Sequence, residues 1–159
     1  MFPAASLGKP VFGYVVLQLA AAGTLDLDRP LIRYFRPEGL PDDPRLERIT
    51  APPGLSHTTG LRNWRSRVDQ PLAPAFEPGE RFQYSGEGFY WLQQVAEAVT
   101  GKGLDRLMRD SLFEPAGMTH ATYGWTEDAR RLAVAGHFNG GTPRTHFSRT
   151  LGEKLLAAS

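Results

Sequence analysis

Ser6 and Lys9 are the residues of this sequence whose types and spacing point most directly to chemistry. Three positions apart at the start of a predicted helix, they lie on one helix face with their side chains in mutual reach. A serine hydroxyl becomes a nucleophile when a base takes its proton, and a neutral lysine amine can be that base. The positive end of the helix dipole would stabilise a developing alkoxide and disfavour the protonated lysine. The alternative is an exposed N-cap serine beside a solvated lysine.

The presence of lysine at position 9 favours the chemical interpretation. The chain has only three lysines, Lys9, Lys102 and Lys154, against fifteen arginines. Because lysine can lose its proton and arginine cannot, a lysine at this position could serve as a base where an arginine could not.

The helix that must carry this pair is predicted over about residues 7–22. Its apolar positions recur at helical spacing, and Gly23 stands where a left-handed C-terminal cap would lie. Pro10 is tolerated because first-turn amides have no partner within a helix. Its position places the helix start close to Ser6.

Residues 36–81 are predicted to form an irregular layer of loops. Eight prolines in this stretch forbid long helices and central strands. The stretch also contains large apolar side chains that need burial, so we interpret it as a structured cover and not as a linker. These side chains are Leu55, Leu61, Trp64, Leu72 and Phe76.

Two more helices are predicted after the loop layer. The first carries apolar residues from Phe89 onward and ends at Gly101, and the second starts at an Asp105 cap and stops before Pro115. The C-terminal part is turn-rich without a sustained period. Short extended pieces could form only at residues 81–85 and at Leu132 to Phe138. The chain is therefore predicted to be mainly α-helical, with long loops and few strands.

Composition limits the classes of partner. With 159 residues, 41% of them hydrophobic, the chain can form one domain or a piece of one. The net charge of +1 indicates neither a nucleic-acid-binding surface nor a polybasic membrane anchor, so a small molecule or another polypeptide is the expected partner. We interpret the cluster of Arg62, Arg65 and Arg67 as a solvated loop.

Several kinds of site and segment are not expected. The absence of cysteine excludes a disulfide scaffold, a cysteine nucleophile and a thiolate zinc site. Val11 to Ala22, the longest largely apolar run, is shorter than the roughly 20 residues that span a bilayer, and no export signal opens the chain. The histidines lack zinc-binding spacing, so we expect neither a metal nor another cofactor and interpret them as structural or exposed. They are His57, His120, His137 and His146.

Four segments follow one another in a recognisable order. They are Phe2 to Asp28, which contains Ser6 and Lys9; Leu55-Ser56-His57-Thr58-Thr59-Gly60-Leu61; Phe76 to Ser85; and Val99 to Thr119. Together they resemble the beta-lactamase-related serine hydrolases, which include class C beta-lactamases, D-alanyl-D-alanine carboxypeptidases and esterases. The resemblance covers residues 2 to about 141.

This resemblance implies a role for each of three residues. Ser6 would be the acylated nucleophile, Lys9 its hydrogen-bonded partner, and Tyr84 a phenol or phenolate that carries protons. A tyrosine with a pKa near 10 can be a base near neutral pH only if nearby positive charge, here Lys9, favours its phenolate. The alternative for Tyr84 is a core or rim aromatic residue with a satisfied hydroxyl. The implied substrate is a small-molecule ester, beta-lactam or D-amino-acid peptide.

The sequence departs from the family pattern at Gly86, which we place in the substrate-binding region. Many members have an asparagine there that binds the substrate amide, so glycine favours an ester or another small acyl substrate. Glu87 is either a replacement contact or a solvated glutamate at a helix N-terminus. No Gly-x-Ser-x-Gly elbow surrounds Ser85, which we expect to orient the loop that carries Tyr84.

The resemblance also implies an α/β fold for the full-length family, in which a helical domain packs on an antiparallel sheet. Residues 1–159 are predicted to be a partial domain, with the sheet strands outside it, and residues 142–159 contain no match to the family's third motif. We therefore expect this chain alone to be helix-rich, poorly soluble and nearly inactive. Full-length relatives are often exported. The alternative is a non-catalytic helical module or a decayed fragment of that family.

One consequence of missing strands would be uncovered helix faces. We expect the apolar faces of the helices to lack the layer that buries them and to promote association. The positions concerned are Phe12, Leu19, Leu92 and Val99.

Overall fold

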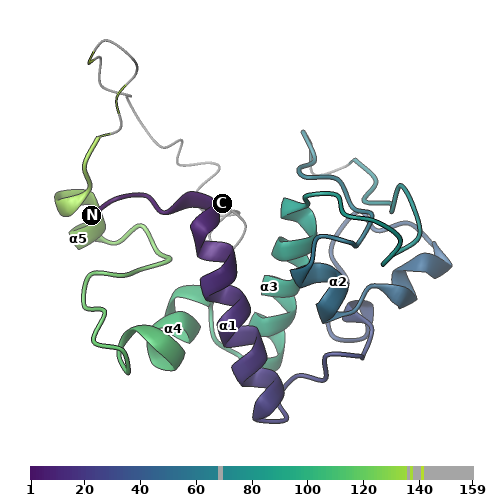
Figure 1. Cartoon of the computed structure of the whole chain (residues 1–159), viewed down its shortest axis with the longest axis horizontal. Helices are drawn as coiled ribbons and strands as arrows, with labels where there is room; N and C mark the ends of the chain where they lie inside the picture. Colours follow the sequence, from purple (N-terminus) through teal and green to yellow (C-terminus); the bar gives the residue numbers. More distant parts are fainter. Residues whose placement is uncertain (68–69, 136, 138–140, 142–159) are drawn as a thin grey trace.

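The computed structural model describes residues 1–67, 70–135, 137 and 141. The α-helices in these residues are α1 (Gly8–Ala21), α2 (Ala51–Leu55), α3 (Gly86–Thr100), α4 (Leu104–Met108) and α5 (Glu127–Leu132), as Figure 1 shows. Shorter turns are the 3-10 segments η1 (Ala5–Leu7), η2 (Leu31–Arg33) and η3 (Pro44–Arg48) and the π-helical η4 (Arg109–Phe113). The described residues contain no β-strand, so the prediction of a mainly helical chain with long loops is confirmed.

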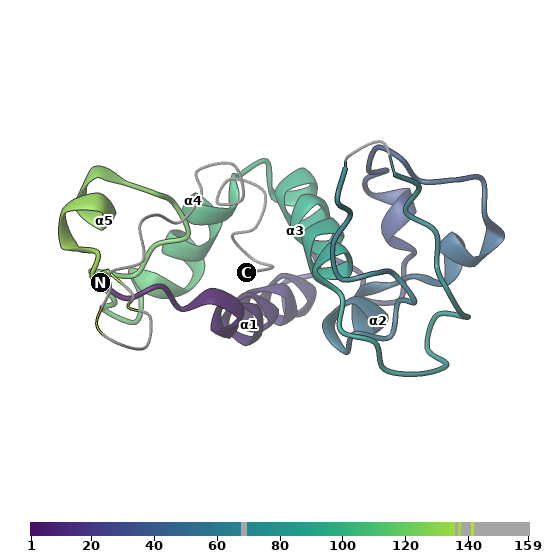
Figure 2. The ribbon, with the colours of Figure 1, turned by 90° about the horizontal axis from the view of Figure 1, so that it is seen from above.

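The helices α1 and α3 lie at the centre, with α4 and α5 on one side and α2 with the loop layer on the other (Figures 1 and 2). The helix predicted over 7–22 is confirmed, and Gly23 follows α1 with a left-handed φ of 71°. The inward face of α1 buries Phe12 and Val16 completely. Because burying one such side chain contributes roughly 1.5–3 kcal/mol, this face holds the helix in place.

The loop layer over residues 36–81 is a packed cover, as predicted, but it is less irregular than expected. It contains η3 and α2, because prolines occupy their first-turn positions, where no amide donor is needed. The indole of Trp91 ties α3 to the chain just before this layer by donating to the carbonyl oxygen of Phe35 at 2.9 Å. All the large apolar side chains named for this layer are at least half-buried: Leu55, Leu61, Trp64, Leu72 and Phe76.

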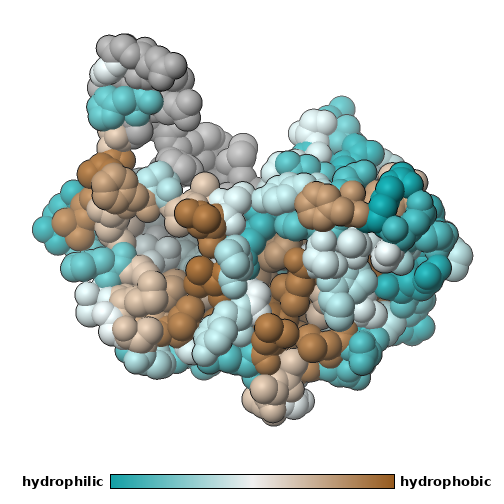
Figure 3. Space-filling view, in the orientation of Figure 1, coloured by the Kyte–Doolittle hydropathy of each residue, from teal (hydrophilic) through white to brown (hydrophobic). Residues whose placement is uncertain are grey.

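The helix faces that were expected to lack cover are packed, and a different face of the first helical segment is open. Phe12 and Leu92 are fully buried, and Leu19 and Val99 pack against the same core. Figure 3 shows apolar surface over the region of α1. The large apolar side chains that are more than half exposed on this segment are Leu7, Tyr14 and Leu17.

The two helices that follow the loop layer are present, with one correction. α3 ends as predicted at Gly101, whose φ is 67°. Asp105 is not the cap of the next helix, because Gly103 holds that position and Asp105 lies in the first turn of α4. Its carboxylate instead accepts hydrogen bonds from residues 122–124, at 2.7 to 3.1 Å. Asp105 therefore ties a distant loop to α4.

The helix α5 departs from the turn-rich C-terminal part that the sequence predicts. Its N-cap Thr126 accepts a hydrogen bond from the amide of Ala129 at 3.1 Å, and two acidic residues follow the cap. This capping pattern is a helix-start signal. Periodicity alone misses it, because a helix of six residues is too short to show a period.

Neither predicted extended piece forms a strand within the described residues. Residues 81–85 run as an irregular segment into α3, and Leu132 is the last residue of α5. The remainder of the second piece lies partly outside the described residues, as do His146 and residues 142–159.

Candidate active site

Three polar side chains from distant parts of the chain meet at one point. Tyr84 Oη donates a hydrogen bond to Ser6 Oγ at 2.8 Å, and Lys9 Nζ donates to the same oxygen at 3.2 Å. Lys9 Nζ also lies 5.0 Å from the centre of the Tyr84 ring. The structure thus brings together the three residues that the family resemblance singles out, although 78 positions separate the serine from the tyrosine.

Ser6 lies on η1, immediately before α1, and is exposed. The preceding Ala5 has a φ of 46°, a left-handed value that is rare for a residue with a Cβ. Such strain costs about 1–3 kcal/mol and persists where the surroundings enforce it. On the other side of Ser6, the hydroxyl of Tyr123 donates to the carbonyl oxygen of Gly8, the first residue of α1, at 2.6 Å. Tyr123, from a distant part of the chain, therefore helps to hold the start of α1 next to Ser6.

Lys9 is a buried residue, with only 3% of its surface exposed. The alternative of a solvated lysine beside an N-cap serine is therefore wrong on both counts, since Leu7 is the N-cap of α1. The lysine amine lies over two aromatic rings, at 5.0 Å from the centre of the Tyr84 ring and 5.8 Å from that of Phe89. Its surroundings direct it toward Ser6 and Tyr84.

Tyr84 lies at the rim of the site, with 38% of its surface exposed. Burial raises the pKa of Tyr84, but hydrogen bonds with Lys9 and Ser6 and the charge of Lys9 together bring that pKa below its ordinary value of 10.0. A lower pKa increases the fraction of phenolate near neutral pH. Tyr84 is therefore suited to accept the proton of the Ser6 hydroxyl.

Ser85 and Glu87 hold the segment that carries this tyrosine. Ser85 caps α3 by accepting from the Gly88 amide at 2.9 Å, and it donates to a loop-layer carbonyl, that of Arg62, at 3.0 Å. Both sequence-based interpretations of Glu87 are wrong, because it is buried and accepts from Arg65 Nε at 3.0 Å and from the Arg65 amide at 2.9 Å. Arg65 is accordingly part of a buried ion pair and not of a solvated loop.

His57 was interpreted from the sequence as structural or exposed, and it lies directly against the site. Its ring centre is 4.3 Å from that of Tyr84 and 4.8 Å from that of Phe89. The signal that could have found it is its place in one of the segments that resemble the family. His120 and His137 are exposed, as that interpretation allowed.

Gly86 lies in the first turn of α3, two positions after Tyr84, and Trp64 fills the space beside it. A Cβ at position 86 would lie 2.2 Å from the Trp64 ring, far inside contact distance. The Gly86 amide donates to Asn63 Oδ1 at 2.9 Å. The chain therefore has no room for a longer side chain at this position while Trp64 keeps its place.

Gly86→Asn is expected to destabilise the protein by about 1–3 kcal/mol, the usual cost of overpacking. Combining it with Trp64→Ala should cancel part of that cost, because the two side chains compete for the same space. Urea unfolding measures both effects. Gly103→Asn is the matched control, because a Cβ there meets nothing within 4 Å. A Gly86→Asn variant as stable as this control would contradict the assignment of the space to Trp64.

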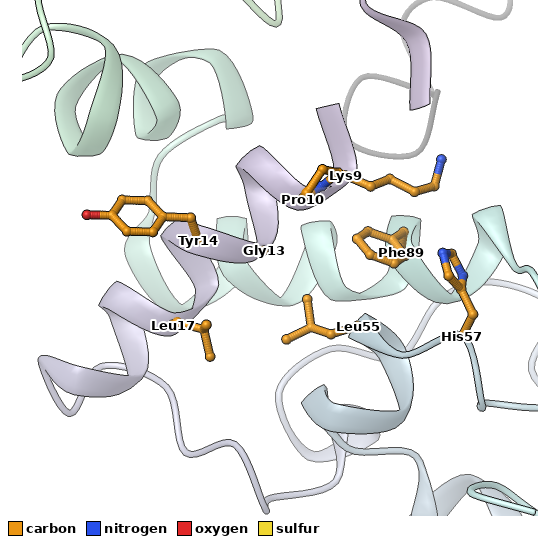
Figure 4. Close-up of a pocket in the computed structure, with 8 residues that line it drawn as sticks. All are labelled: Lys9, Pro10, Gly13, Tyr14, Leu17, Leu55, His57 and Phe89. Carbon is orange, nitrogen blue, oxygen red and sulfur yellow. The ribbon is translucent and has the colours of Figure 1, made fainter. Parts of the chain in front are cut away.

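An open groove of about 440 Å³ begins at Lys9 and follows α1. Figure 4 shows the Lys9 side chain extending past Phe89 toward His57, with Leu55 and Leu17 farther along the groove. Most of the lining side chains are apolar. Lys9, a catalytic candidate, thus lies at one end of a largely apolar groove.

The part of the chain that the structure describes contains no helix long and apolar enough to cross a membrane. The same residues contain no group of three or more His, Asp or Glu side chains placed to hold a metal ion.

Comparison with known families decides the classification. Residues 1–153 match the family model described as Beta-lactamase. The chain belongs to the beta-lactamase family. The resemblance drawn from the four sequence segments is thereby confirmed.

Two curated relatives and a solved structure show how much of the family this beta-lactamase-family chain represents. Penicillin-binding protein 4 of Amycolatopsis lactamdurans is 28% identical over 149 residues, which cover 85% of this chain and 39% of that protein. Esterase EstB of Burkholderia gladioli is 29% identical over 169 residues, covering 86% of this chain and 42% of that protein. A class C beta lactamase structure aligns with a TM-score of 0.78 at 20% identity, over 96% of this chain and 45% of the other. The chain thus matches the fold of part of that structure and spans about two fifths of the relatives' length.

Proposed function

We propose that this chain carries the nucleophile site of a serine hydrolase that acts through an acyl-enzyme on an ester or another small acyl compound. The observation that carries the proposal is the contact of Ser6 Oγ with both Tyr84 Oη, at 2.8 Å, and Lys9 Nζ, at 3.2 Å. A nucleophilic hydroxyl with a proton acceptor and a cation in hydrogen-bonding range is the arrangement that covalent catalysis requires.

Acylation follows from this arrangement in two proton transfers. Ser6 Oγ attacks the carbonyl carbon of the ester while its proton passes to the phenolate oxygen of Tyr84. The tetrahedral intermediate then expels the alcohol, which takes that proton from the Tyr84 phenol as the carbon–oxygen bond breaks. The charge of Lys9 stabilises the phenolate before and after the step.

Deacylation uses the same group in the same way. Water attacks the acyl carbon while the Tyr84 phenolate takes a proton from it. The proton then passes to Ser6 Oγ as the ester bond to the serine breaks. The products are a carboxylic acid and an alcohol, and the protein returns to its starting state.

The packing around Gly86 supports an ester in preference to a beta-lactam or a D-amino-acid peptide. A side-chain amide at this position would be the group that binds a substrate amide, and the Trp64 ring occupies its space. An ester lacks the amide hydrogen that such a group would recognise. The relatives include both an esterase and a penicillin-binding protein, so the family supports either class.

A second candidate is a non-catalytic module of the same family. It is favoured by one observation: within residues 1–67 and 70–135 no strand offers a backbone amide opposite the serine. A missing oxyanion-hole donor lowers turnover by about 10²- to 10³-fold. We propose accordingly that residues 1–159 alone are nearly inactive and that the full protein containing them is the active form.

The test is covalent labelling of the full protein with an activated ester or a penicillin-like probe, followed by peptide mass spectrometry. We expect the added acyl mass on the peptide that contains Ser6. Ser6→Ala should abolish it, while Ser66→Ala, at an exposed position in the loop layer, should leave it unchanged. A label that maps to Ser85, or that survives in Ser6→Ala, would reject the nucleophile assignment. A protein that takes up no label would favour the non-catalytic module.

A further inference from the structure

We propose that His57 is a positioning residue that holds the Tyr84 phenol against Ser6, by binding the chain on both sides of the tyrosine and packing on its ring. The inference rests on the proposed function, because it names the residue that orients the proton carrier of that site. It assigns His57 no proton transfer of its own.

The first support is a pair of hydrogen bonds that flank the tyrosine. The carbonyl oxygen of His57 accepts from the amide of Gln83 at 2.8 Å, and His57 Nδ1 accepts from the amide of Ser85 at 3.1 Å. One residue therefore holds the backbone immediately before and immediately after Tyr84. In an irregular segment without strand pairing, these two bonds fix the point from which the tyrosine side chain starts.

The second support is the stacking of the rings. The His57 and Tyr84 ring centres are 4.3 Å apart, with their planes tilted by 30°. The imidazole also contacts Phe89, with ring centres 4.8 Å apart. Since Phe89 is buried in α3, the imidazole is a fixed surface against which the phenol rests. The two hydrogen bonds of His57 thus fix the backbone on both sides of Tyr84, and its ring restricts the side-chain torsions of Tyr84.

The third support is the backbone of His57 itself, which has a left-handed φ of 58°. Residues other than glycine seldom adopt this conformation, although histidine, asparagine and aspartate do so more often than most. The conformation turns the carbonyl oxygen and Nδ1 of one residue toward the same segment, residues 83–85. Strain of this kind persists where the contacts that it makes possible outweigh its cost.

The protonation state agrees with this role. An Nδ1 atom that accepts a hydrogen bond carries no proton, so the proton of the neutral ring lies on Nε2. Burial, followed by the charge of Lys9, lowers the pKa of His57 below its ordinary value of 6.5. The titratable groups that face the ring are Lys9 and Tyr84. The neutral form stabilises the fold at pH values above 6.5, and that contribution is lost as the pH falls and the unfolded chain takes up the proton first.

Two substitutions that tolerate the left-handed backbone separate the contributions. His57→Gly removes both the ring and the acceptor without adding backbone strain. His57→Asn removes the ring but places an amide oxygen near the position of Nδ1, where it can accept from Ser85. In the full protein we expect His57→Gly to lower kcat by roughly 10- to 100-fold with little change in KM, as for a misplaced catalytic group, and His57→Asn to recover a measurable part.

A positioning role predicts two results that loss of stability alone would not produce. In a Tyr84→Phe background, His57→Gly should lower kcat by less than about threefold, because the group that it positions is already gone. Ultraviolet difference titration, taken against Tyr84→Phe, should show the pKa of Tyr84 moving back toward 10.0 in His57→Gly, away from Lys9 and Ser6. An unchanged pKa of Tyr84, or equal losses in kcat with and without the Tyr84 hydroxyl, would overturn the proposal.

The titration also separates this proposal from the proposed function. A wild-type protein that takes up no acyl label but shows the shift in the Tyr84 pKa would reject the hydrolase and keep the positioning role. A protein that is labelled at Ser6, but whose Tyr84 pKa is the same in wild type and His57→Gly, would support the hydrolase and reject the positioning role.

Discussion

Lys9→Arg is expected to slow acylation of Ser6 by about 10³-fold or more, although the substitution keeps the positive charge. Lys9 is buried, and its amine lies 3.2 Å from Ser6 Oγ. In the proposed mechanism Lys9 places a compact positive charge beside Ser6 and the Tyr84 phenolate, and a guanidinium group spreads that charge over three nitrogens. It is also planar and larger than an ammonium group, so it cannot occupy the same point between Ser6 and the two aromatic rings. Rapid-mixing kinetics of ester turnover measure the loss.

Lys9→Met is the matched variant, because it keeps an unbranched side chain of nearly the same length and removes both the charge and the amine protons. In this variant the pKa of Tyr84 should rise, since the charge of Lys9 and its hydrogen bond lower it in the wild type. In the proposed mechanism the phenolate takes the serine proton, so the acylation rate should rise with pH through that pKa, and this rise should move to higher pH in Lys9→Met. Wild-type rates in Lys9→Arg, with thermal melting showing that both variants are folded, would show that any positive charge at this position is enough and that the compact ammonium group is not required.

Tyr84→Phe is expected to lower turnover by about 10²- to 10⁴-fold, the usual span for a general acid–base group. The change removes one hydroxyl from a side chain that is already 38% exposed, so the packing of the ring on His57 should remain. The loss of its hydrogen bond to Ser6 should cost only about 0.5–1.5 kcal/mol of stability. Steady-state ester hydrolysis and urea unfolding together separate the catalytic from the structural effect.

Tyr34→Phe is the control for Tyr84→Phe, since it also removes a tyrosine hydroxyl that makes hydrogen bonds, here with the Asp26 backbone away from the site. Its turnover should equal that of the wild type. A Tyr84→Phe variant within about twofold of this control would make Tyr84 a structural rim residue and return the role of base to Lys9.

The parts of this molecule that local sequence determines could be predicted from it. The helix that carries Lys9 and begins just after Ser6 has a clear apolar period and a glycine that follows its end, so its range was predictable to within a residue or two. The three-residue spacing correctly predicted that Lys9 would reach Ser6, although Ser6 lies on the 3-10 turn η1 and not on α1. Tyr84 could be named only through the family resemblance, because nothing in the spacing of residues 6 and 84 states that they meet.

The errors at Asp105, Glu87 and His57 share a physical cause, which is pairing across long sequence separations. Asp105 is a residue type that often caps helices, but its carboxylate accepts hydrogen bonds from residues 122–124. Glu87 has the position of a solvated first-turn glutamate, but it pairs with Arg65. In each case a local signal correctly marks the start of a helix, and a distant partner then takes the side chain. His57 is the same kind of case, because its significance depends on a segment about 27 residues later.

The fit of Trp64 against Gly86 has a consequence for how this site could change in evolution. An ancestor or descendant with a large side chain at position 86 needs a small one at position 64, so the two positions cannot be exchanged independently. If a large residue appears at position 86 while Trp64 is present, the intermediate protein folds poorly. If Trp64 is replaced by a small residue first, the intermediate protein has an unfilled space beside Gly86. Replacement of Trp64 first is the less damaging order. Trp64 is only half-buried, so water can fill the space that the indole leaves. The residues at positions 64 and 86 are therefore expected to change together.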